Sequence, residues 1–500
     1  MRSISRRADI AAAAALAAAC TLVALAATAA AAALELTLVP AWEGNYRPGA
    51  ATEVLARVVS PTAGELTLRA TDEAMTLVAR RHVEPSTAVE VAFAILPTAS
   101  TLTVEARLDF REPVEHSLQL LPLDRPLVPV VADGRDDLAA WLAPGARYAP
   151  QPVAAKSLPR TAAGYGPAAA VVLAGDTLDR LDAEQREALR AHVASCGRVL
   201  VPAQAERAAA ELAVLSACGD RFVSRAESPA ALAAALGVRP TTLPSYEQIL
   251  PLGAEPPRLF GLVVWFFLGY VVLLAACALP RLTGARATAA LLALPVLASA
   301  LMLAAWSENA PERRVLLWAE LESGRATARY RLLYDVHSRG TGALALAAPA
   351  ALGLPVTLFE QRAEVGLSPD TTRLSLTPRL LSRVSFGFGG TLAYTPSLTL
   401  ERDAEGALVT NRGAGVSPAA TLVHAGRYYA VPALAAGATW RRAPDAPALP
   451  RPELPPTFPP RDADALLLSL PLASLLPDAP PHDAAQAWLA LHLPRNGTPP

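Results

Sequence analysis

Lysine, net charge and cysteine are all scarce in this chain. Lys156 is the single lysine among 44 basic residues, and 45 acidic residues leave a formal net charge of −1. A chain so balanced has no electrostatic footprint for a polyanion, so nucleic acid is not an expected partner. Four cysteines are too few for a disulfide scaffold. The arginine-rich and alanine-rich composition is typical of a bacterial envelope protein.

Motifs that bind cofactors or metals are missing as well. The chain has no P-loop, no G-x-G-x-x-G after a predicted strand and no H-x-x-x-H pair. Its histidines do not cluster in the sequence, which is typical of histidines at the surface or hydrogen-bonded in a core. We therefore expect no cofactor and no metal.

Charged residues are also missing from two adjacent apolar runs, Leu259 to Leu279 and Ala287 to Trp306. Each is about long enough to cross roughly 30 Å of hydrocarbon as a helix. The turn between them carries Arg281 and Arg286 without an acid, which by the positive-inside rule places it in the cytoplasm. We therefore expect a transmembrane helical hairpin at 259–306 in the lipid bilayer. The protein would be a multi-pass protein of the bacterial inner membrane with both large domains periplasmic.

Residues 1–33 have the pattern of a signal peptide. Arg2, Arg6 and Arg7 precede an apolar stretch from Ile10 to Leu34, and the alanine run near its end offers cleavage sites. Either the segment is cleaved near Ala31 to Ala33, or it stays as an uncleaved signal anchor. Both alternatives export the segment that follows.

Residues 34–124 are expected to form an immunoglobulin-like β-sandwich. Short runs alternate apolar with polar side chains, and turn residues separate them. Repeated short strands at this spacing are typical of a small antiparallel sandwich. The predicted strands are 36–39, 53–59, 65–69, 89–93 and 102–108.

Residues 125–250 show a different period. Short buried-strand patterns at 127–131, 169–175 and 198–202 are separated by helical stretches, of which Asp182 to Ala194 is the most amphipathic. Strands that alternate with helices indicate crossover connections and a parallel sheet. We expect a three-layer α/β domain of flavodoxin-like form, which makes the whole chain a multidomain α/β plus β protein.

This region resembles a known family. The family's motifs are matched by Leu158-Pro159-Arg160, Gly164-Tyr165, the strand from Val171, the helix from Gln185 to Val193, and Gly197-Arg198-Val199-Leu200-Val201. They resemble the class I glutamine-amidotransferase-like domain of uncharacterised bacterial membrane proteins, from Leu127 to about Leu250. The resemblance implies a cysteine nucleophile directly after the third strand and a histidine that activates it. Ala203 stands near that place, so the resemblance implies the fold without the activity, a pseudoenzyme.

Two cysteines of the exported region leave alternatives open. Cys196 and His192 either form a dyad, since i and i+4 share a helix face, or His192 lies on an ordinary amphipathic face. Cys196 and Cys218 either form a disulfide in an oxidising compartment or are separate buried thiols.

Two carboxylates are the candidate catalytic residues. Asp133 follows the first strand of the α/β region and Asp176 the second, at the edge where open α/β sheets place ligands. They would hold a metal or a sugar hydroxyl there. Alternatively, Asp133 starts a turn and Asp176 caps a helix, roles that aspartate favours.

The rest of the chain is expected to be a periplasmic β domain at 307–442, a Pro-rich linker at 443–463 and a C-terminal extension at 464–500. Strand-like runs include 315–321, 326–334, 372–376 and 407–411. The linker is too rich in proline for a helix or a central strand. Ala465 to Leu476 is too short to span a membrane and is expected to pack back on the β domain.

Two functions of different class follow. The first is a non-enzymatic, membrane-anchored periplasmic scaffold whose amidotransferase-like domain is inactive. By analogy with the family, its partners would be membrane proteins with von Willebrand-type domains or an ABC-type export complex. The alternative is an envelope hydrolase or ligand-binding receptor that uses Asp133 and Asp176.

Overall fold

The computed structural model describes most of the β-rich parts of the chain. The described residues are 34–131 (without 73, 74, 98 and 110), 148–201 (without 174–176), 312–337, 343–349, 363–368, 370–377, 383–403, 406–443, 445–451 and 464–493, with isolated short pieces at 212, 223–225, 243, 249, 268–269, 271–272, 352 and 356–357.

The first β segment, 34–122, forms two facing sheets. One has the order β1-β3-β6, from Glu35–Pro40, Thr52–Val59 and Ala88–Ile95. The other contains β5-β4-β7-β8, from Met75–Val83, Gly64–Thr71, Thr101–Leu108 and Val114–Gln119. All of these neighbours are antiparallel. The alternation of apolar and polar residues predicted β1, β3, β4, β6 and β7, because side chains of a strand point to opposite faces, but it did not predict β5 and β8.

A strand from far along the chain completes the second of these sheets. β19 (Ala363–Leu367) pairs in parallel with β5, and β20 (Thr371–Leu376) and β17 (Leu344–Pro349) continue the sheet beyond it. The result is one seven-stranded sheet with the order β17-β20-β19-β5-β4-β7-β8. The first β segment is therefore not an independent sandwich.

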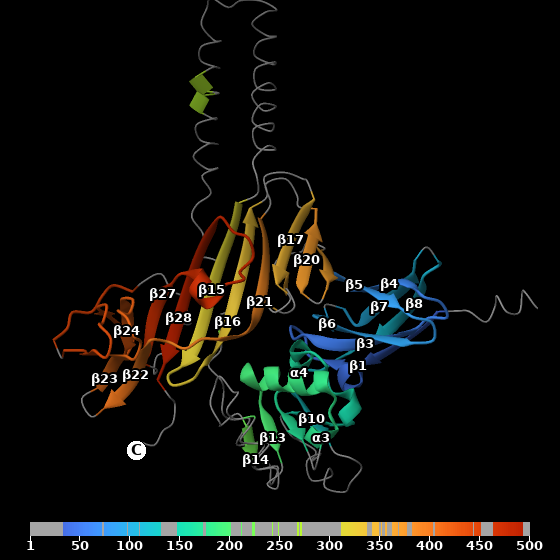
Figure 1. Cartoon of the computed structure of the whole chain (residues 1–500), viewed down its shortest axis with the longest axis horizontal. Helices are drawn as coiled ribbons and strands as arrows, with labels where there is room; N and C mark the ends of the chain where they lie inside the picture. Colours follow the sequence, from blue (N-terminus) through green and yellow to red (C-terminus); the bar gives the residue numbers. More distant parts are fainter. Residues whose placement is uncertain are drawn as a thin grey trace, which may run out of the picture.

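An eight-stranded sheet dominates the C-terminal part, drawn from yellow to red in Figure 1. Its order is β18-β21-β16-β15-β28-β27-β24-β25. The strands are β15 (Glu312–Glu322), β16 (Thr327–His337), β18 (Val356–Thr357), β21 (Arg383–Ala393), β24 (Ala420–His424), β25 (Arg427–Val431), β27 (Ala465–Leu470) and β28 (Ala484–His492). A three-stranded sheet follows the order β22-β23-β26, from Leu398–Asp403, Gly406–Asn411 and Thr439–Arg441.

The C-terminal extension packs back on this sheet. β27 and β28 are central strands of it, and the short helix α10 (Leu472–Leu475) buries Leu472 and Leu475 in the main core. This confirms the prediction for Ala465 to Leu476.

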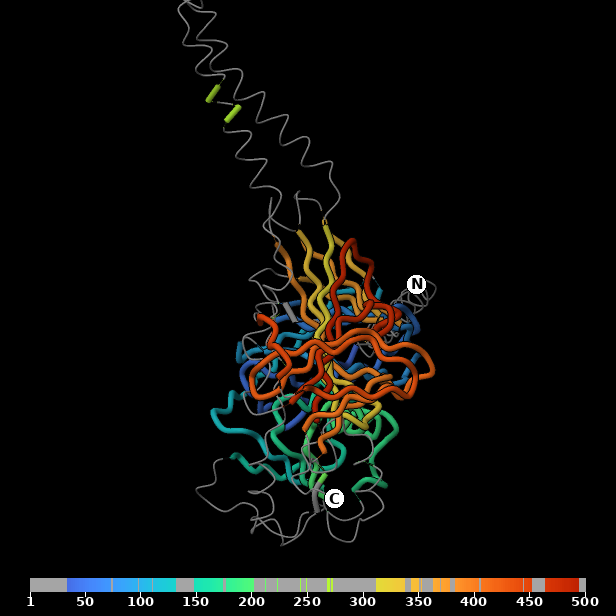
Figure 2. The backbone as a smooth tube through the Cα atoms, turned by 90° about the vertical axis from the view of Figure 1, so that its left-hand side faces the viewer, coloured from blue at the N-terminus to red at the C-terminus, as the bar shows by residue number. Residues whose placement is uncertain are grey.

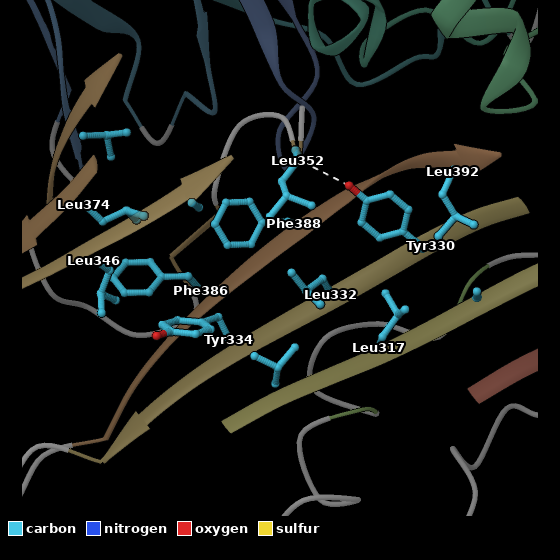
Figure 3. Packing of buried hydrophobic residues seen from close by; sticks show 14 of the residues in the cluster. Leu317, Tyr330, Leu332, Tyr334, Leu346, Leu352, Leu374, Phe386, Phe388 and Leu392 are labelled. Carbon is cyan, nitrogen blue, oxygen red and sulfur yellow. Dashed lines mark hydrogen bonds between the residues drawn. The ribbon is translucent and has the colours of Figure 1, made fainter. Parts of the chain in front are cut away.

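One apolar core joins the first β segment to the C-terminal sheets. It is a single cluster of buried side chains that combines residues from Leu36 to Leu120 with residues from Val315 to Leu491. Figure 3 shows Phe386 of β21 beside Leu346 and Leu374 of β17 and β20, with Phe388 next to it. Fully burying one such side chain contributes about 1.5–3 kcal/mol.

Residues 127–225 hold a second, smaller core around a parallel sheet, shown in green at one end of the molecule in Figures 1 and 2. The sheet order is β11-β10-β12-β13-β14, from Ala149–Val153, Leu127–Val131, Val171–Leu173, Val199–Val201 and Val223–Arg225. Every pairing is parallel. The predicted parallel pairing of this region is therefore confirmed.

Helix α4 (Ala183–Ala194) confirms the amphipathic helix predicted there, and both of its ends follow from local sequence. The Asp182 carboxylate accepts a hydrogen bond from the Gln185 backbone N–H at 2.7 Å, and the Gln185 side-chain oxygen accepts one from the Asp182 backbone N–H. These two bonds form a capping box. At the other end, Gly197 N–H donates to His192 and Cys196 N–H to Val193, the two bonds of a Schellman motif.

The predicted fold class is wrong as a whole. Among the described residues, 56% are in strands, 13% are in helices, and the α-helices are α3 (Thr177–Arg180), α4 and α10. Of the helices in the described part of the chain, α4 alone is longer than four residues, so a three-layer flavodoxin-like domain is not supported. The other helical stretches expected within 125–250 lie almost entirely outside the described residues. The sequence pattern also did not reveal that distant strands share one sheet.

The predicted membrane topology is corrected as well. Of the hairpin at 259–306, only residues 268, 269, 271 and 272 are described, and the signal segment 1–33 lies outside the described residues. Within the described part of the chain, no helix is both long and apolar enough to cross a bilayer. A multi-pass inner-membrane protein with periplasmic domains is therefore not supported.

Candidate binding groove at the joint of three segments

A buried carboxylate fastens the first β segment to the α/β segment. Glu53 lies on β3, on the face turned away from the sandwich core, and is 4% exposed. It accepts hydrogen bonds from the backbone N–H of Arg160 at 2.9 Å and of Thr161 at 2.7 Å, and from the Thr161 hydroxyl at 2.7 Å. We call this set the Glu53 clamp. Because a buried carboxylate must be fully hydrogen-bonded, the clamp fixes the segment that leads into β12.

Two glycines allow the backbones to approach at this joint. A Cβ on Gly164 would lie 2.6 Å from the Pro159 Cβ and 2.9 Å from the Glu53 Cβ. A Cβ on Gly166 would lie 2.4 Å from the backbone oxygen of Ala51. Both contacts are shorter than van der Waals distance, so only glycine fits at these positions.

Arg160 collects carboxylates from both sides of the joint. Its guanidinium bonds to Glu90 of β6 and lies 3.4 Å from the Asp182 carboxylate and 3.8 Å from that of Glu184. Although burial lowers it, the pKa of Arg160 is raised overall because of the hydrogen bond to Glu90 and the charges of the three acids. Arg160 is therefore a fixed cation between β6 and the start of α4.

The two carboxylates of the joint differ in their electrostatics. Burial raises the pKa of Glu53, although the donors from Arg160 and Thr161 oppose this rise. Glu90 is more exposed, with 32% of its side chain accessible, and its carboxylate forms an ion pair with the Arg160 guanidinium. The neutral backbone donors of the clamp therefore compensate the desolvation of Glu53 only in part.

An aromatic stack lies beneath the clamp. Trp42, in the short 3-10 turn η1 (Ala41–Gly44), is fully buried and donates from Nε1 to the Gly164 oxygen at 2.8 Å. Its ring meets Tyr165 edge-on at 5.6 Å, and Tyr165 stacks on His192 at 4.8 Å. The first β segment thus inserts a tryptophan into the core of the α/β segment.

A groove of about 610 Å³ opens beside the clamp. β3, β5, β6 and β19 contribute one wall, and α4 and residues 160–162 contribute the other. Its apolar lining consists of alanine, leucine and valine side chains, and its charged lining consists of Arg81, Glu90, Arg160, Glu184 and Glu187. The groove lies where the first β segment, the α/β segment and the C-terminal segment meet, and its size is typical of ligand sites.

The predicted catalytic carboxylates, and the position expected for a cysteine nucleophile, fall on residues that the structure does not describe. Asp133, Asp176 and Ala203 lie outside the described residues. His192 and Cys196 are described, and both are buried at the end of α4.

The Cys196–His192 alternative is wrong. Cys196 is disulfide-bonded, so its sulfur is not available as a thiolate nucleophile. Burial lowers the pKa of His192 to about 4, and its Nε2 has no hydrogen-bond partner among the described residues. A Cβ on Gly197 would lie 2.3 Å from that ring, so the histidine packs against the glycine. The other cysteines, Cys20, Cys218 and Cys277, lie outside the described residues, and the pairing with Cys218 stays a prediction.

A second polar cluster lies at the end of β16 and β21. Asp335 accepts from Ser385 Oγ at 2.5 Å and from Arg383 Nε at 2.8 Å, and it lies 3.0 Å from His337 Nε2. Burial opposes ionisation here, but the three side-chain bonds lower the pKa of Asp335 to about 2. Ser385 bonds to the aspartate and not to a histidine, so the cluster has no activated nucleophile. It is a stabilised carboxylate in a sheet.

Sequence reasoning missed the residues of the joint. Glu53 and Glu90 sit in strands as ordinary polar members of an alternating pattern, and nothing in that pattern says which outward face is covered by another segment. Arg160 is part of the Leu158-Pro159-Arg160 motif, but the sequence assigned it no role. The amphipathic pattern from Asp182 to Ala194 was a local signal in this region that the structure confirms, as helix α4.

Searches against family models, curated proteins and solved structures gave no match to this chain.

Proposed function

We propose that this chain is a non-enzymatic scaffold that binds a partner protein in the groove beside the Glu53 clamp. One observation carries the proposal: β19 joins β5 in a single sheet, so the first β segment and the C-terminal segment form one rigid frame with a continuous core. One wall of the groove is built on that frame, and the docked α/β segment contributes the other. A binding surface on rigid strands and a capped helix is pre-organised and costs little ordering on binding.

The chemistry of the described residues supports binding more than catalysis. Arg160 is held by three carboxylates, Asp335 is held by three donors, and the Cys196 sulfur is in a disulfide. Groups used in this way stabilise the frame. Recognition without chemistry needs only a shaped, partly apolar groove with charges at its rim, and this groove has both.

The test compares two exposed alanines of one connecting segment. Ala162 lines the groove and Ala154 does not. Tagged full-length chains with Ala162→Trp or Ala154→Trp would be purified from the native cells, and co-purifying proteins quantified. We expect Ala162→Trp to lose its partners and Ala154→Trp to keep them. Proteins with von Willebrand-type domains or an ABC-type export complex are the partners to look for first.

A third variant tests the enzymatic alternative. Asp133→Ala with Asp176→Ala should keep the partners and restore the phenotype of a deletion strain. If this variant keeps the partners and still fails to restore the phenotype, the scaffold proposal is wrong, because the carboxylates then do chemistry that binding alone does not explain.

A further inference from the structure

The open edge of β6 lies along the groove. β6 pairs with β3 and is the last strand of the order β1-β3-β6 within the described part of the chain. Glu90, Val91 and Ala92 are consecutive residues of β6, and all three line the groove. Since consecutive side chains of a strand point to opposite faces, a groove lined by all three follows the edge of the strand.

The opposite wall of the groove is one face of α4. α4 turns Ala183, Glu184, Glu187, Ala188 and Ala191 toward the groove, a spacing that defines one helix face. Three of the five are alanines, so this face is shallow. From 183 to 191 the helix extends about 12 Å at 1.5 Å per residue, which is the length of three to four residues of an extended chain.

The charges of the lining select a basic occupant. Carboxylates of Glu90, Glu184 and Glu187 outnumber the guanidinium groups of Arg81 and Arg160. Arg160 is already paired with Glu90 and Glu184, whereas Glu187 makes no ion pair among the described residues. Glu184 and Glu187 are three residues apart and therefore neighbours on the helix surface. Arg81, on the β5 side, repels a cation at that wall.

We propose that the groove takes an extended peptide segment of a partner protein as an added strand on β6, with a lysine or arginine of that segment against Glu184 and Glu187. The inference rests on the proposed scaffold function and gives its partner a chemistry. Backbone bonds to an exposed strand edge supply affinity in this mode of recognition, and side-chain pockets supply specificity. The alanine, leucine and valine side chains that line the groove would contact small or β-branched side chains on either side of the basic residue of the bound segment.

Two synthetic peptides test this with the full-length chain. The probe is acetyl-Thr-Val-Lys-Val-Thr-amide, and its counterpart has glutamate in place of lysine. Binding is measured by calorimetry, and backbone hydrogen exchange is followed at β6. We expect the lysine peptide to slow exchange at residues 89–94 and the glutamate peptide to bind at least about tenfold more weakly, a difference of about 1.4 kcal/mol.

A matched pair of variants locates the charge effect. Glu184→Gln with Glu187→Gln removes two exposed carboxylates of the groove, and Glu112→Gln with Glu115→Gln removes two exposed carboxylates of equal spacing elsewhere. The first pair should weaken the lysine peptide about tenfold and the second should leave it unchanged. Equal binding of both peptides, or unchanged exchange at β6, overturns the proposal.

A second copy of the chain is the remaining occupant to separate. If sedimentation shows a concentration-dependent dimer that protects β6 without peptide, the edge belongs to a self-association and the proposal is wrong. If neither peptide binds but Ala162→Trp still releases partners from the full chain, the proposed scaffold function is kept. Only the proposal of a basic extended segment on β6 is then wrong.

Discussion

Two joints hold the first β segment, and they are built in opposite ways. At the joint with the C-terminal segment, β5 and β19 share backbone hydrogen bonds and one apolar core. At the joint with the α/β segment, the cores are separate, and the contact consists of the Glu53 clamp, the Arg160 ion pairs and the inserted Trp42. The first is a continuation of a sheet, and the second is a docking of two surfaces.

The difference predicts how each joint fails. Parts that share a sheet and a core lose structure together, since the core of one is incomplete without the other. Parts that dock through a clamp separate first and unfold later, as interfaces within a chain usually do. Local stability should therefore differ across the molecule.

The largest effect is expected at the shared sheet. Val365 of β19 is fully buried, so Val365→Asp places an uncompensated carboxylate in the main core and should cost about 5 kcal/mol. Hydrogen-exchange protection should fall together in β4, β5, β16 and β21. Glu364→Gln, next to it but exposed and paired only with Arg69 at the surface, should change stability by less than about 1 kcal/mol. Loss of protection in β19 alone would contradict a shared core.

A smaller loss is expected at the docked joint. Trp42→Ala removes a fully buried side chain from the smaller core and should cost about 4 kcal/mol. Protection should fall in β10, β12, β13 and α4 while β16 and β21 keep theirs. Trp42→Phe, which keeps an aromatic ring but not the bond to Gly164, should cost about 1 kcal/mol. If Trp42→Ala also exposed β16, the two joints would not be independent.

Acid should change the stability of the C-terminal sheet, through Asp335, and of the docked joint, through Glu53, in opposite directions. The pKa of Asp335 is lowered to about 2 from 3.8, so its contribution of about 2 kcal/mol is present above pH 3.8 and is lost as the pH falls toward 2. The raised pKa of Glu53 acts oppositely, because the folded state then binds its proton more tightly than the unfolded chain.

Urea unfolding between pH 2 and pH 6 checks this prediction. Asp335→Asn should lose stability at pH 6 and match the wild type near pH 2. Glu53→Gln should remove the stabilisation that the wild-type joint gains when the pH falls toward 4.5, the ordinary pKa of a glutamate. The same pH dependence in both variants would show that one of the two assignments is wrong.

The smallest effect is expected at the end of α4. Cys196 has a φ of 69° at the position after the helix where glycine is usual. With reductant present, Cys196→Gly should therefore stabilise the chain by about 1 kcal/mol, since the left-handed conformation costs a side-chain residue about that much. Without reductant, the variant should be less stable because it lacks the disulfide. Ser195→Gly, at a negative φ of −82°, should give no gain in either condition.

Much of the local structure was predictable from the sequence. Alternation in 53–59 and 102–108 predicted β3 and β7, and the amphipathic run from Asp182 predicted α4. These elements follow from side-chain periodicity, which is local. β5 and β19 were not predicted, because Arg80, Arg81 and Gly366 interrupt their apolar patterns. The candidate site was missed for a different reason, since Glu53 reads like any outward-facing strand residue until another segment covers it.

The sequence by itself determined strands such as β3 and β7, helix α4 and the parallel pairing of the α/β segment, because these follow from side-chain periodicity and from the alternation of strands with helices. Only the tertiary structure decided that residues near 77 and near 365 share a sheet, and that Glu53, Glu90 and Arg160 meet at a groove. Such pairings join parts of the chain hundreds of residues apart. They are selected by the burial of whole faces, a property that no short stretch of sequence carries.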